Sequence, residues 1–240
     1  MDENITIRGK GAFVSGATGA IGRSIAIALA NNGCNLFLTG RNEEKLDKIA
    51  NEISSLNVSV SYMAGDLVNR NKINEIIKEA NDYLDSIDII INSAGVFPYI
   101  NLIDISDTDF SNVMDINFRS ALIFTREFSK KMIKRKWGRI VNIGSSSAYN
   151  GFKRTSLYCA SKHALLGFSK SIHDELKQYN IRSYCISPSS TQSKMGLETK
   201  NQDYSTFLDP KDVAKYVIFA ISFEGNIISE EILLKRMFTQ

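Results

Sequence analysis

Short apolar segments alternate along the chain with longer segments that have a helical period. The apolar segments are rich in Val, Ile, Leu and Phe and carry few charges, a composition typical of strands buried on both faces of a sheet. They span residues 11–15, 34–39, 58–63, 87–92, 139–143, 182–187 and 227–234. The pattern therefore predicts seven strands.

The segments between these strands have the spacing of amphipathic helices. Ile21, Ile25 and Leu29 recur every four residues, and Gly33 then provides a C-terminal stop. Further helices are expected over residues 43–56, 69–84, 107–135 and 156–179, and Pro98, Pro188 and Pro210 are expected in loops. Repeated strand–helix–strand units predict a parallel sheet, because each crossover places a helix on one face of it. The expected fold is α/β: residues 1–240 form a single doubly wound (Rossmann) domain, a seven-stranded parallel sheet with helices on both faces.

The composition excludes several functions. A net charge of +3 predicts no nucleic-acid partner, and the basic run 130–139 lies where a helix ends and cations complement its dipole. No apolar segment approaches the roughly 20 residues that cross a bilayer, and the amino end lacks the apolar region of a signal peptide. We therefore expect a cytoplasmic protein without a membrane partner. No disulfide or metal site is expected, because the spacing fits neither for Cys34, Cys159, Cys185, His163 and His173.

A glycine-rich turn follows the first expected strand and leads into the first helix. Glycines let the backbone approach an anionic group closely, and a helix N-terminus presents free N–H groups and a positive dipole end to it. Because this turn joins the first strand to the first helix, it predicts a dinucleotide site. Its expected cofactor-binding residues are Gly16, Thr18, Gly19, Ala20, Ile21 and Gly22.

The end of the second strand indicates which dinucleotide binds. NAD-binding folds place an acidic residue there, which binds the ribose 2′-hydroxyl. Here Gly40 is followed by Arg41, and no carboxylate is present. A guanidinium can form a bidentate contact with a 2′-phosphate, whereas the alternative is a solvated arginine that opens the next helix. We expect NADP(H) as the cofactor.

A serine, a tyrosine and a lysine follow the fifth strand. Ser145 precedes Tyr158 by thirteen residues, and Tyr158 and Lys162 are four apart, so the last two share a helix face. An ammonium beside a phenol favours the phenolate and should lower the phenol pKa. A tyrosine in that setting can act as a general acid or base.

Together with the glycine loop, these residues resemble the short-chain dehydrogenase/reductase family, in its short single-domain branch, over nearly the whole chain. Asp66-Leu67 matches the family's adenine-contacting pair, and Asn92-Ser93-Ala94-Gly95 matches its Asn-Asn-Ala-Gly turn. Asn117 matches the asparagine of the catalytic tetrad. The segment that lines the nicotinamide is matched by Pro188 and by Ser193-Lys194-Met195.

The resemblance implies a role for each matched residue. Ser145 orients the substrate oxygen, Tyr158 passes the proton, Lys162 also binds the ribose, and Asn117 holds a water in the proton relay. These four are the expected catalytic residues. The remaining cofactor-binding residues are expected to be Arg41, Asp66, Leu67, Asn92, Ala94, Gly95, Tyr158, Lys162, Pro188 and Ser193.

The activity so implied interconverts a ketone and a secondary alcohol, a small-molecule substrate, with NADP(H). The segment 138–145 is most similar to 3-oxoacyl-(acyl-carrier-protein) reductases, and residues 194–209 are expected to cover the substrate. Of the two basic positions that dock the carrier in those enzymes, Lys136 matches one and Tyr179 stands at the other. A homodimer or homotetramer is expected through the helices 107–135 and 156–179, which carry the apolar residues Ile116, Leu122, Phe124, Phe128, Leu165, Phe168 and Ile172.

The glycine loop departs from the family's usual Gly-x-x-x-Gly-x-Gly spacing. Ala20 stands where the middle glycine is expected, and Gly19 creates Gly-x-x-Gly-x-x-Gly, a spacing also found in the longer sugar-nucleotide branch. Two alternatives therefore stay open. One is a sugar-nucleotide epimerase or dehydratase, and the other is a non-catalytic protein that senses NADP.

Overall fold

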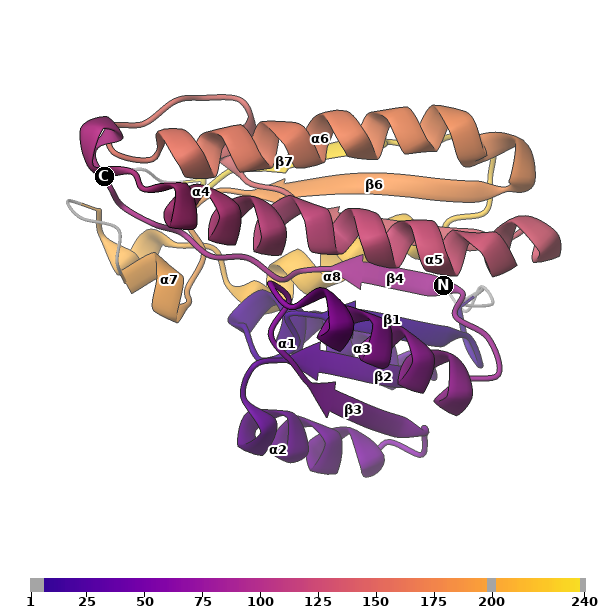
Figure 1. Ribbon diagram of the computed structural model, residues 1–240. Helices are drawn as coiled ribbons and strands as arrows, with labels where there is room; N and C mark the ends of the chain where they lie inside the picture. The colour runs from indigo at the N-terminus through magenta and orange to yellow at the C-terminus, as the bar shows by residue number, and fades with distance from the viewer. Residues whose placement is uncertain (1–6, 198–201, 238–240) are drawn as a thin grey trace.

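A seven-stranded parallel sheet runs through the centre of the computed structural model, which describes residues 7–197 and 202–237 (Figure 1). The strand order is β3-β2-β1-β4-β5-β6-β7, and every neighbouring pair is parallel. This confirms the expected fold. The strands are β1 Gly11–Ser15, β2 Asn35–Gly40, β3 Val60–Ala64, β4 Ile89–Asn92, β5 Gly138–Ile143, β6 Ile181–Pro188 and β7 Glu231–Leu234.

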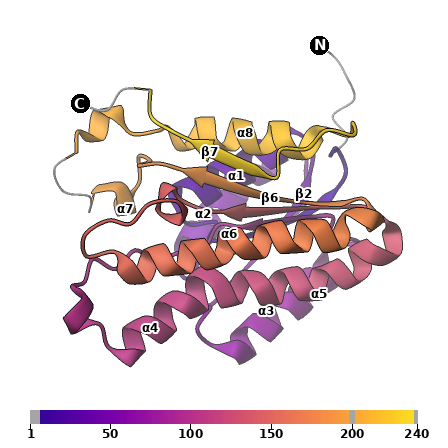
Figure 2. The same ribbon diagram turned by 90° about the horizontal axis from the view of Figure 1, so that it is seen from above.

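Helices cover both faces of the sheet, and Figure 2 shows α3, α5 and α6 on one side of it and α1 and α8 on the other. Side-chain caps begin several of them, among them Asn42, Asn69 and Asp209. The α-helices are α1 Ala20–Asn31, α2 Glu43–Ser54, α3 Arg70–Tyr83, α4 Asp107–Met114, α5 Ser120–Arg135, α6 Ser156–Leu176, α7 Lys194–Leu197 and α8 Pro210–Ser222. Short 3-10 turns cover Leu102–Asp104, Ser146–Ala148, Lys177–Tyr179 and Tyr204–Thr206, and a π-helical turn covers Asp115–Arg119.

Alternate residues of each central strand enter two separate cores. In β1, Ala12 and Val14 enter the first core, with α1, α2 and α8, whereas Phe13 enters the second core, with α3, α5 and α6. The same alternation recurs in β4, where Ile90 faces the second core and Ile89 and Ile91 face the first. Strands buried on both faces explain the continuous apolar segments of the sequence.

The sequence prediction needs correction at α8, at two prolines, in the helix 107–135 and in β7. Helix α8 was not among the expected helices, although Asp209 caps it and Pro210 is its first residue. Pro210 is therefore not in a loop, and Pro188 is the last residue of β6. The expected helix 107–135 is α4 and α5 joined by the π-turn, and β7 covers only the second half of the expected strand 227–234.

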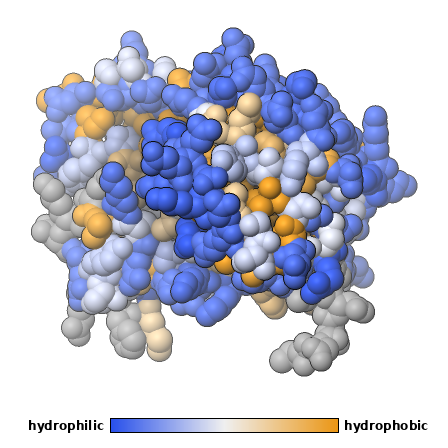
Figure 3. Space-filling view, turned by 90° about the horizontal axis from the view of Figure 1, so that it is seen from below, coloured by the Kyte–Doolittle hydropathy of each residue, from blue (hydrophilic) through white to orange (hydrophobic). Residues whose placement is uncertain are grey.

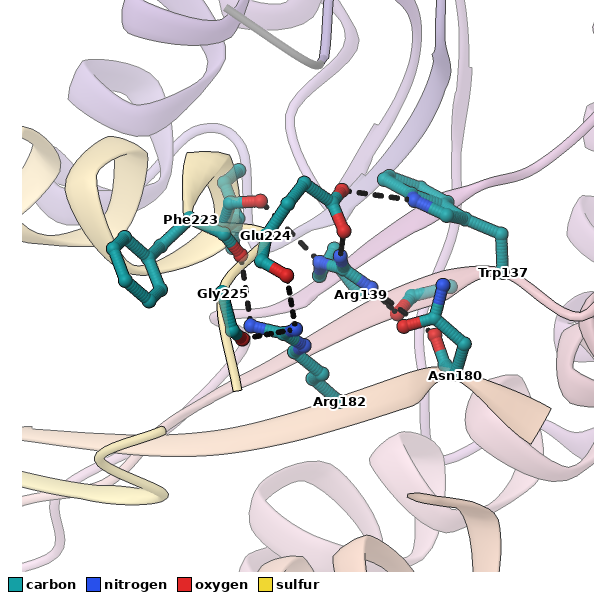
Figure 4. A network of polar contacts seen from close by, with 9 residues as sticks. Trp137, Arg139, Asn180, Arg182, Phe223, Glu224 and Gly225 are labelled. Carbon is teal, nitrogen blue, oxygen red and sulfur yellow. Dashed lines mark hydrogen bonds and ion pairs between the residues drawn. The ribbon is translucent and has the colours of Figure 1, made fainter. Parts of the chain in front are cut away.

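Two arginines in the strands hold the end of α8 at the amino edge of the sheet (Figure 4). Arg139 is fully buried, and its guanidinium lies 2.7 Å from the carboxylate of Glu224. Arg182 donates hydrogen bonds to the carbonyl oxygens of Phe223, Glu224 and Gly225. This network anchors the last helix to β5 and β6, far from the carboxyl ends of the strands.

The surface seen from below in Figure 3 is mainly hydrophilic, with hydrophobic residues in small groups. Within residues 7–197 and 202–237, no helix has the length and apolar character that crossing a membrane requires.

Candidate active site

The strand order reverses between β1 and β4: β2 and β3 lie on one side of β1, and β4 to β7 lie on the other. The loops after β1 and β4 therefore diverge, and in open parallel sheets ligands bind in the crevice at this point, beyond the carboxyl ends of the strands. Loops from β1, β2, β3, β4, β5 and β6 all emerge at this edge. The residues predicted for the cofactor and for catalysis lie on these loops or in the helices that follow them.

The glycine loop packs tightly against the turn after β4. Gly16 has φ +69°, and a Cβ there would lie 2.5 Å from the backbone nitrogen of Ala94. At Gly22 a Cβ would lie 2.3 Å from the carbonyl oxygen of Gly16, so both positions require glycine. Gly19 differs, because its φ is −81° and a Cβ would meet only the Gly16 oxygen, at 3.3 Å. The backbone therefore does not demand the unusual Gly19, and Ala20 is accommodated as the first residue of α1.

The amide groups at the start of α1 are available to an anion. No described residue accepts a hydrogen bond from the backbone N–H of Ala20, Ile21 or Gly22, and no acidic side chain lies in the first turn. Such a cluster of free donors at the positive end of a helix dipole fits a diphosphate.

The tip of β2 lies beside this loop. A Cβ on Gly40 would lie 2.9 Å from the side chain of Thr18, so the two loops are in close contact. Arg41 is exposed and has no hydrogen bond or ion pair with another described residue. Its guanidinium is therefore free to meet an anionic group at this corner.

The predicted adenine-contacting pair follows β3. Asp66 is exposed and accepts a hydrogen bond from the backbone of Val68, whereas Leu67 is buried in the second core. Arg119 of the π-turn donates to the carbonyl oxygen of Val68 and forms a 2.6 Å ion pair with Asp115. The loop after β3 is thus tied to the π-turn that carries Asn117.

Asn117 is buried, and its carboxamide pairs with the backbone of the segment after β4. Its oxygen accepts from the Val96 nitrogen at 2.8 Å, and its nitrogen donates to the Val96 oxygen and to Ser161, each at 3.0 Å. Ser161 in turn donates to the carbonyl oxygen of Tyr158. The structure therefore joins Asn117 to the helix of Tyr158 through one serine.

The turn after β4 lies between these residues. Asn92 donates to Asn142 of β5 and to Thr125, which fixes the end of β4 within the sheet. A Cβ on Gly95 would lie 3.6 Å from the Asn117 oxygen and 3.8 Å from the Lys162 ammonium. The bare glycine thus leaves space beside both polar groups.

Ser145, Tyr158 and Lys162 come together at the end of β5. The Ser145 side chain interacts with the Tyr158 hydroxyl and acts to lower its pKa, and the Ser145 hydroxyl accepts a hydrogen bond from the Ser147 nitrogen. Lys162 lies one turn further along α6, with its ammonium 5.7 Å from the centre of the Tyr158 ring. That ammonium donates a 2.8 Å hydrogen bond to the carbonyl oxygen of Ile143. All three predicted side chains are buried at one point of the crevice edge.

Burial dominates the titration of the tyrosine and the lysine. It raises the pKa of Tyr158 to about 12, although the hydrogen bond with Ser145 acts in the opposite direction. It lowers the pKa of Lys162 to about 8, against a smaller opposing effect of Cys185. The prediction that the lysine lowers the phenol pKa is therefore wrong for this arrangement, because the ammonium binds a backbone carbonyl and the phenol has lost its water.

The described residues of the segment after β6 have no hydrogen bond with Ser145, Tyr158 or Lys162. Pro188 pairs with Leu234 in the sheet, and Ser193 bonds with Thr191 and Gly196 of its own segment. Residues 198–201, within the predicted substrate-covering segment 194–209, lie outside the described residues.

A family model described as short chain dehydrogenase matches residues 10–204. The chain belongs to the short-chain dehydrogenase family. Two 3-oxoacyl-(acyl-carrier-protein) reductases are similar to this protein over nearly its whole length. That of Aquifex aeolicus (strain VF5) is 31% identical over 239 residues, 95% of this chain and 96% of the relative. That of Rickettsia felis is 32% identical over 234 residues, 94% of each.

Solved structures of the same family have the same fold. The crystal structure of a metagenomic short-chain oxidoreductase in complex with NADP superposes with a TM-score of 0.85. It is 25% identical in sequence, and the match covers 97% of this chain and 99% of that one. The expected family is thereby confirmed.

Sequence reasoning missed several groups that contact the predicted dehydrogenase site. The Phe97 ring meets the Tyr158 ring edge-on at 4.8 Å, Ser161 connects Asn117 to Tyr158, and the Ile143 carbonyl binds Lys162. An aromatic residue just after the Asn-Ser-Ala-Gly turn was a signal for Phe97. Neither a helix serine nor a backbone carbonyl has a sequence signal of this kind.

Proposed function

We propose that the chain interconverts a ketone and a secondary alcohol with NADP(H). The observation that carries this proposal is the meeting of three buried side chains at the end of β5: Tyr158, Ser145, which interacts with the Tyr158 hydroxyl, and Lys162, whose ammonium lies 5.7 Å from the centre of the Tyr158 ring. A hydroxyl pair can bind a carbonyl oxygen and exchange a proton with it. The likeness to 3-oxoacyl-(acyl-carrier-protein) reductases supports the same reaction class.

The chain's own residues divide the work. Bound NADP(H) supplies or accepts the hydride. Ser145 donates a hydrogen bond to the substrate oxygen, on which negative charge develops, and Tyr158 gives that oxygen its proton. Lys162 stabilises the tyrosinate that remains and binds the ribose. Asn117 holds the segment after β4 in place and keeps a water in reach of Lys162, in the space beside Gly95.

NADP(H) is favoured over NAD(H) by the corner at β2. Arg41 is exposed there without a carboxylate partner among the described residues, and no acid occupies the strand tip. An arginine in this position can bind a 2′-phosphate through two hydrogen bonds. The remaining cofactor contacts are proposed for Gly16, Thr18, Gly19, Ala20, Ile21, Gly22, Asp66, Leu67, Asn92, Ala94, Gly95, Pro188 and Ser193.

A free ketone suits the site better than a carrier-bound one. Lys136 is exposed at the end of α5, but Tyr179, at the second carrier-docking position, packs against the second core. A tyrosine held in this way offers no charge to an acidic carrier.

We also propose a homodimer or homotetramer through α5 and α6, on revised grounds. Phe124, Phe128 and Leu165 are buried within their own chain and cannot contribute to an interface. Phe118 of the π-turn before α5 and Phe168 of α6 remain partly exposed, and their rings meet edge-on with centres 5.7 Å apart. This aromatic pair offers an apolar contact to a symmetry mate.

A panel of ketones and alcohols, followed through the absorbance of NADPH, tests the proposed activity. Turnover of at least one pair, lost in Tyr158→Phe, is the expected result. A protein that binds NADPH but turns over no member of the panel in either direction would instead be a cofactor-sensing protein.

A further inference from the structure

Arg154 holds an unusual position at the edge of the crevice. It lies in the loop between β5 and α6, four residues before Tyr158, and its φ is +66°. Residues other than glycine rarely adopt this left-handed backbone, and such outliers concentrate at functional sites. The backbone conformation thus directs attention to what its side chain does.

The segment after β4 contacts both Arg154 and the Tyr158 ring. The Arg154 guanidinium lies over the Tyr99 ring, 4.7 Å from its centre, and the Ile100 nitrogen donates to the Arg154 carbonyl oxygen at 2.9 Å. Two residues before Tyr99, the Phe97 ring meets Tyr158. One short segment, which leaves β4 toward the left of Figure 1, therefore contacts both Arg154 and the ring of the proposed acid.

The guanidinium has no carboxylate partner among the described residues. Arg154 is exposed and is absent from every ion pair in residues 7–197 and 202–237. Asp104, the acid in the loop after β4, accepts instead from Asn101. The contact with Tyr99 uses no N–H donor, and no described residue accepts a hydrogen bond from the Arg154 guanidinium, so its donors are available to a ligand.

The two segments that meet at Arg154 carry exposed apolar side chains. Leu102 and Ile103 follow Tyr99 and are 75% and 92% exposed, and Phe152, two residues before Arg154, is 53% exposed. A ligand that contacts both the cation and these residues would combine a charged end with an apolar spacer.

We propose that Arg154 binds the carboxylate of a keto acid whose carbonyl is reduced at Tyr158. The proposal rests on the proposed function and names its substrate class, a ketone joined to a carboxylate through an apolar chain. Arg41 cannot serve this purpose, because it lies at β2, on the other side of the crevice. The guanidinium, held by Tyr99, recognises the carboxylate through paired hydrogen bonds.

A homologous series tests the proposal. The substrates are methyl ketones with one to five methylene groups between the carbonyl and a carboxylate, each paired with its neutral methyl ester. For parent, Arg154→Met, Arg154→Lys and Lys153→Met, kcat/KM is measured for acid and ester with NADPH. Met keeps an unbranched apolar side chain and removes the charge. Lys153→Met removes the same charge from the adjacent exposed residue, which also has no ion pair among the described residues.

The parent should prefer the acid over its ester at one chain length. Arg154→Met should lower that acid-to-ester ratio about ten- to a hundredfold, the range for a lost charge-assisted contact. The acid-to-ester ratio of Arg154→Lys should lie between those of the parent and Arg154→Met. Lys153→Met should change this ratio less than about threefold, because a screened surface charge contributes little to the binding of a distant carboxylate. An unchanged ratio in Arg154→Met, or an equal fall in Lys153→Met, would overturn the proposal.

Failure of the proposed activity gives a different result. If the parent turns over neither acids nor esters, the proposed function fails, and dissociation constants of the same acids for the protein with NADP are then measured by calorimetry. Tighter binding of an acid than of its ester, lost in Arg154→Met, would still support the anion site. Equal binding by the two proteins would exclude it.

Discussion

The Lys162 ammonium lies 2.8 Å from the Ile143 carbonyl oxygen, at the last residue of β5. This hydrogen bond fixes the lysine against the end of the sheet, one helical turn from Tyr158. The charge is thus held near the phenol without touching it, and the phenol stays protonated in the free protein because burial raises its pKa to about 12. A protonated Tyr158 is the form that ketone reduction requires.

Tyr158→Phe should abolish most turnover and leave the protein folded. The substitution keeps the ring that packs on Phe97 and removes only the hydroxyl, which interacts with Ser145. We expect kcat to fall by roughly 10²–10⁴-fold, the usual contribution of a general acid. NADPH affinity, measured by fluorescence titration, should change less than about threefold. Near-parental turnover in this variant would show that another group supplies the proton.

Lys162→Met should stabilise the fold at neutral pH while damaging activity and NADPH binding. In the folded chain the lysine pKa is about 8, against 10.5 unperturbed, so burying its charge costs stability. Below pH 8 both folded and unfolded states are protonated and the full cost is present. Between pH 8 and 10.5 the unfolded state binds more protons, so the parent's free energy of unfolding rises with pH.

The lowered pKa of Lys162 corresponds to on the order of 3 kcal/mol of unfolding free energy that the parent lacks at pH 7. About 1 kcal/mol is subtracted from the gain of the variant, because the variant loses the hydrogen bond to Ile143. The free energy of unfolding of Lys162→Met should therefore exceed that of the parent by on the order of 2 kcal/mol at pH 7. This difference should become smaller toward pH 10.5. Urea unfolding at several pH values measures this. His163→Gln, at the adjacent exposed position, is the control and should show no such pH-dependent margin. A margin that does not vary with pH would contradict the assignment.

The sheet was predictable because both of its faces are buried. Segments such as Ile89–Asn92 and Gly138–Ile143 are apolar throughout, and the sequence prediction placed them within two residues. Helix α8 escaped because Pro210 was interpreted as a loop residue, although proline is well suited to the first turn of a helix. The π-turn at Asn117 could not be predicted, because the helical spacing continues through it and the partner of Asn117, Val96, lies 21 residues earlier in the chain.

The candidate site was predictable in its residues but not in its electrostatics. The spacing of Tyr158 and Lys162 indicated a shared helix face, and the structure places both at the crevice edge. The direction of the Tyr158 pKa shift depends on burial and on the partner that the ammonium selects. That partner is the backbone oxygen of Ile143, which any residue type could provide.

Arg41→Ala should remove most of the preference for NADPH. The exposed guanidinium at the tip of β2 has no carboxylate partner among the described residues, so its loss should affect a 2′-phosphate and little else. The dissociation constant for NADPH should rise about ten- to a hundredfold, and that for NADH by less than about threefold. Lys45→Ala, which removes an exposed charge from the first turn of α2, is the matched control. A parent that binds both cofactors equally would disprove the choice of NADP(H).

Gly16→Ala and Gly19→Ala should separate the two tasks of the glycine loop. At Gly16, a new Cβ would lie 2.5 Å from the Ala94 nitrogen in a left-handed backbone, so the turn must move. We expect a loss of at least about 2 kcal/mol in the free energy of unfolding, together with weaker NADPH binding.

At Gly19 the backbone is extended and the closest contact would be 3.3 Å, so stability should change by less than about 1 kcal/mol. Its NADPH affinity should nevertheless fall, because the added methyl group stands where the diphosphate must approach the start of α1. Denaturant unfolding and NADPH titration of the two variants measure these effects separately. Equal unfolding free energies for the two variants would show that the loop is not built around Gly16.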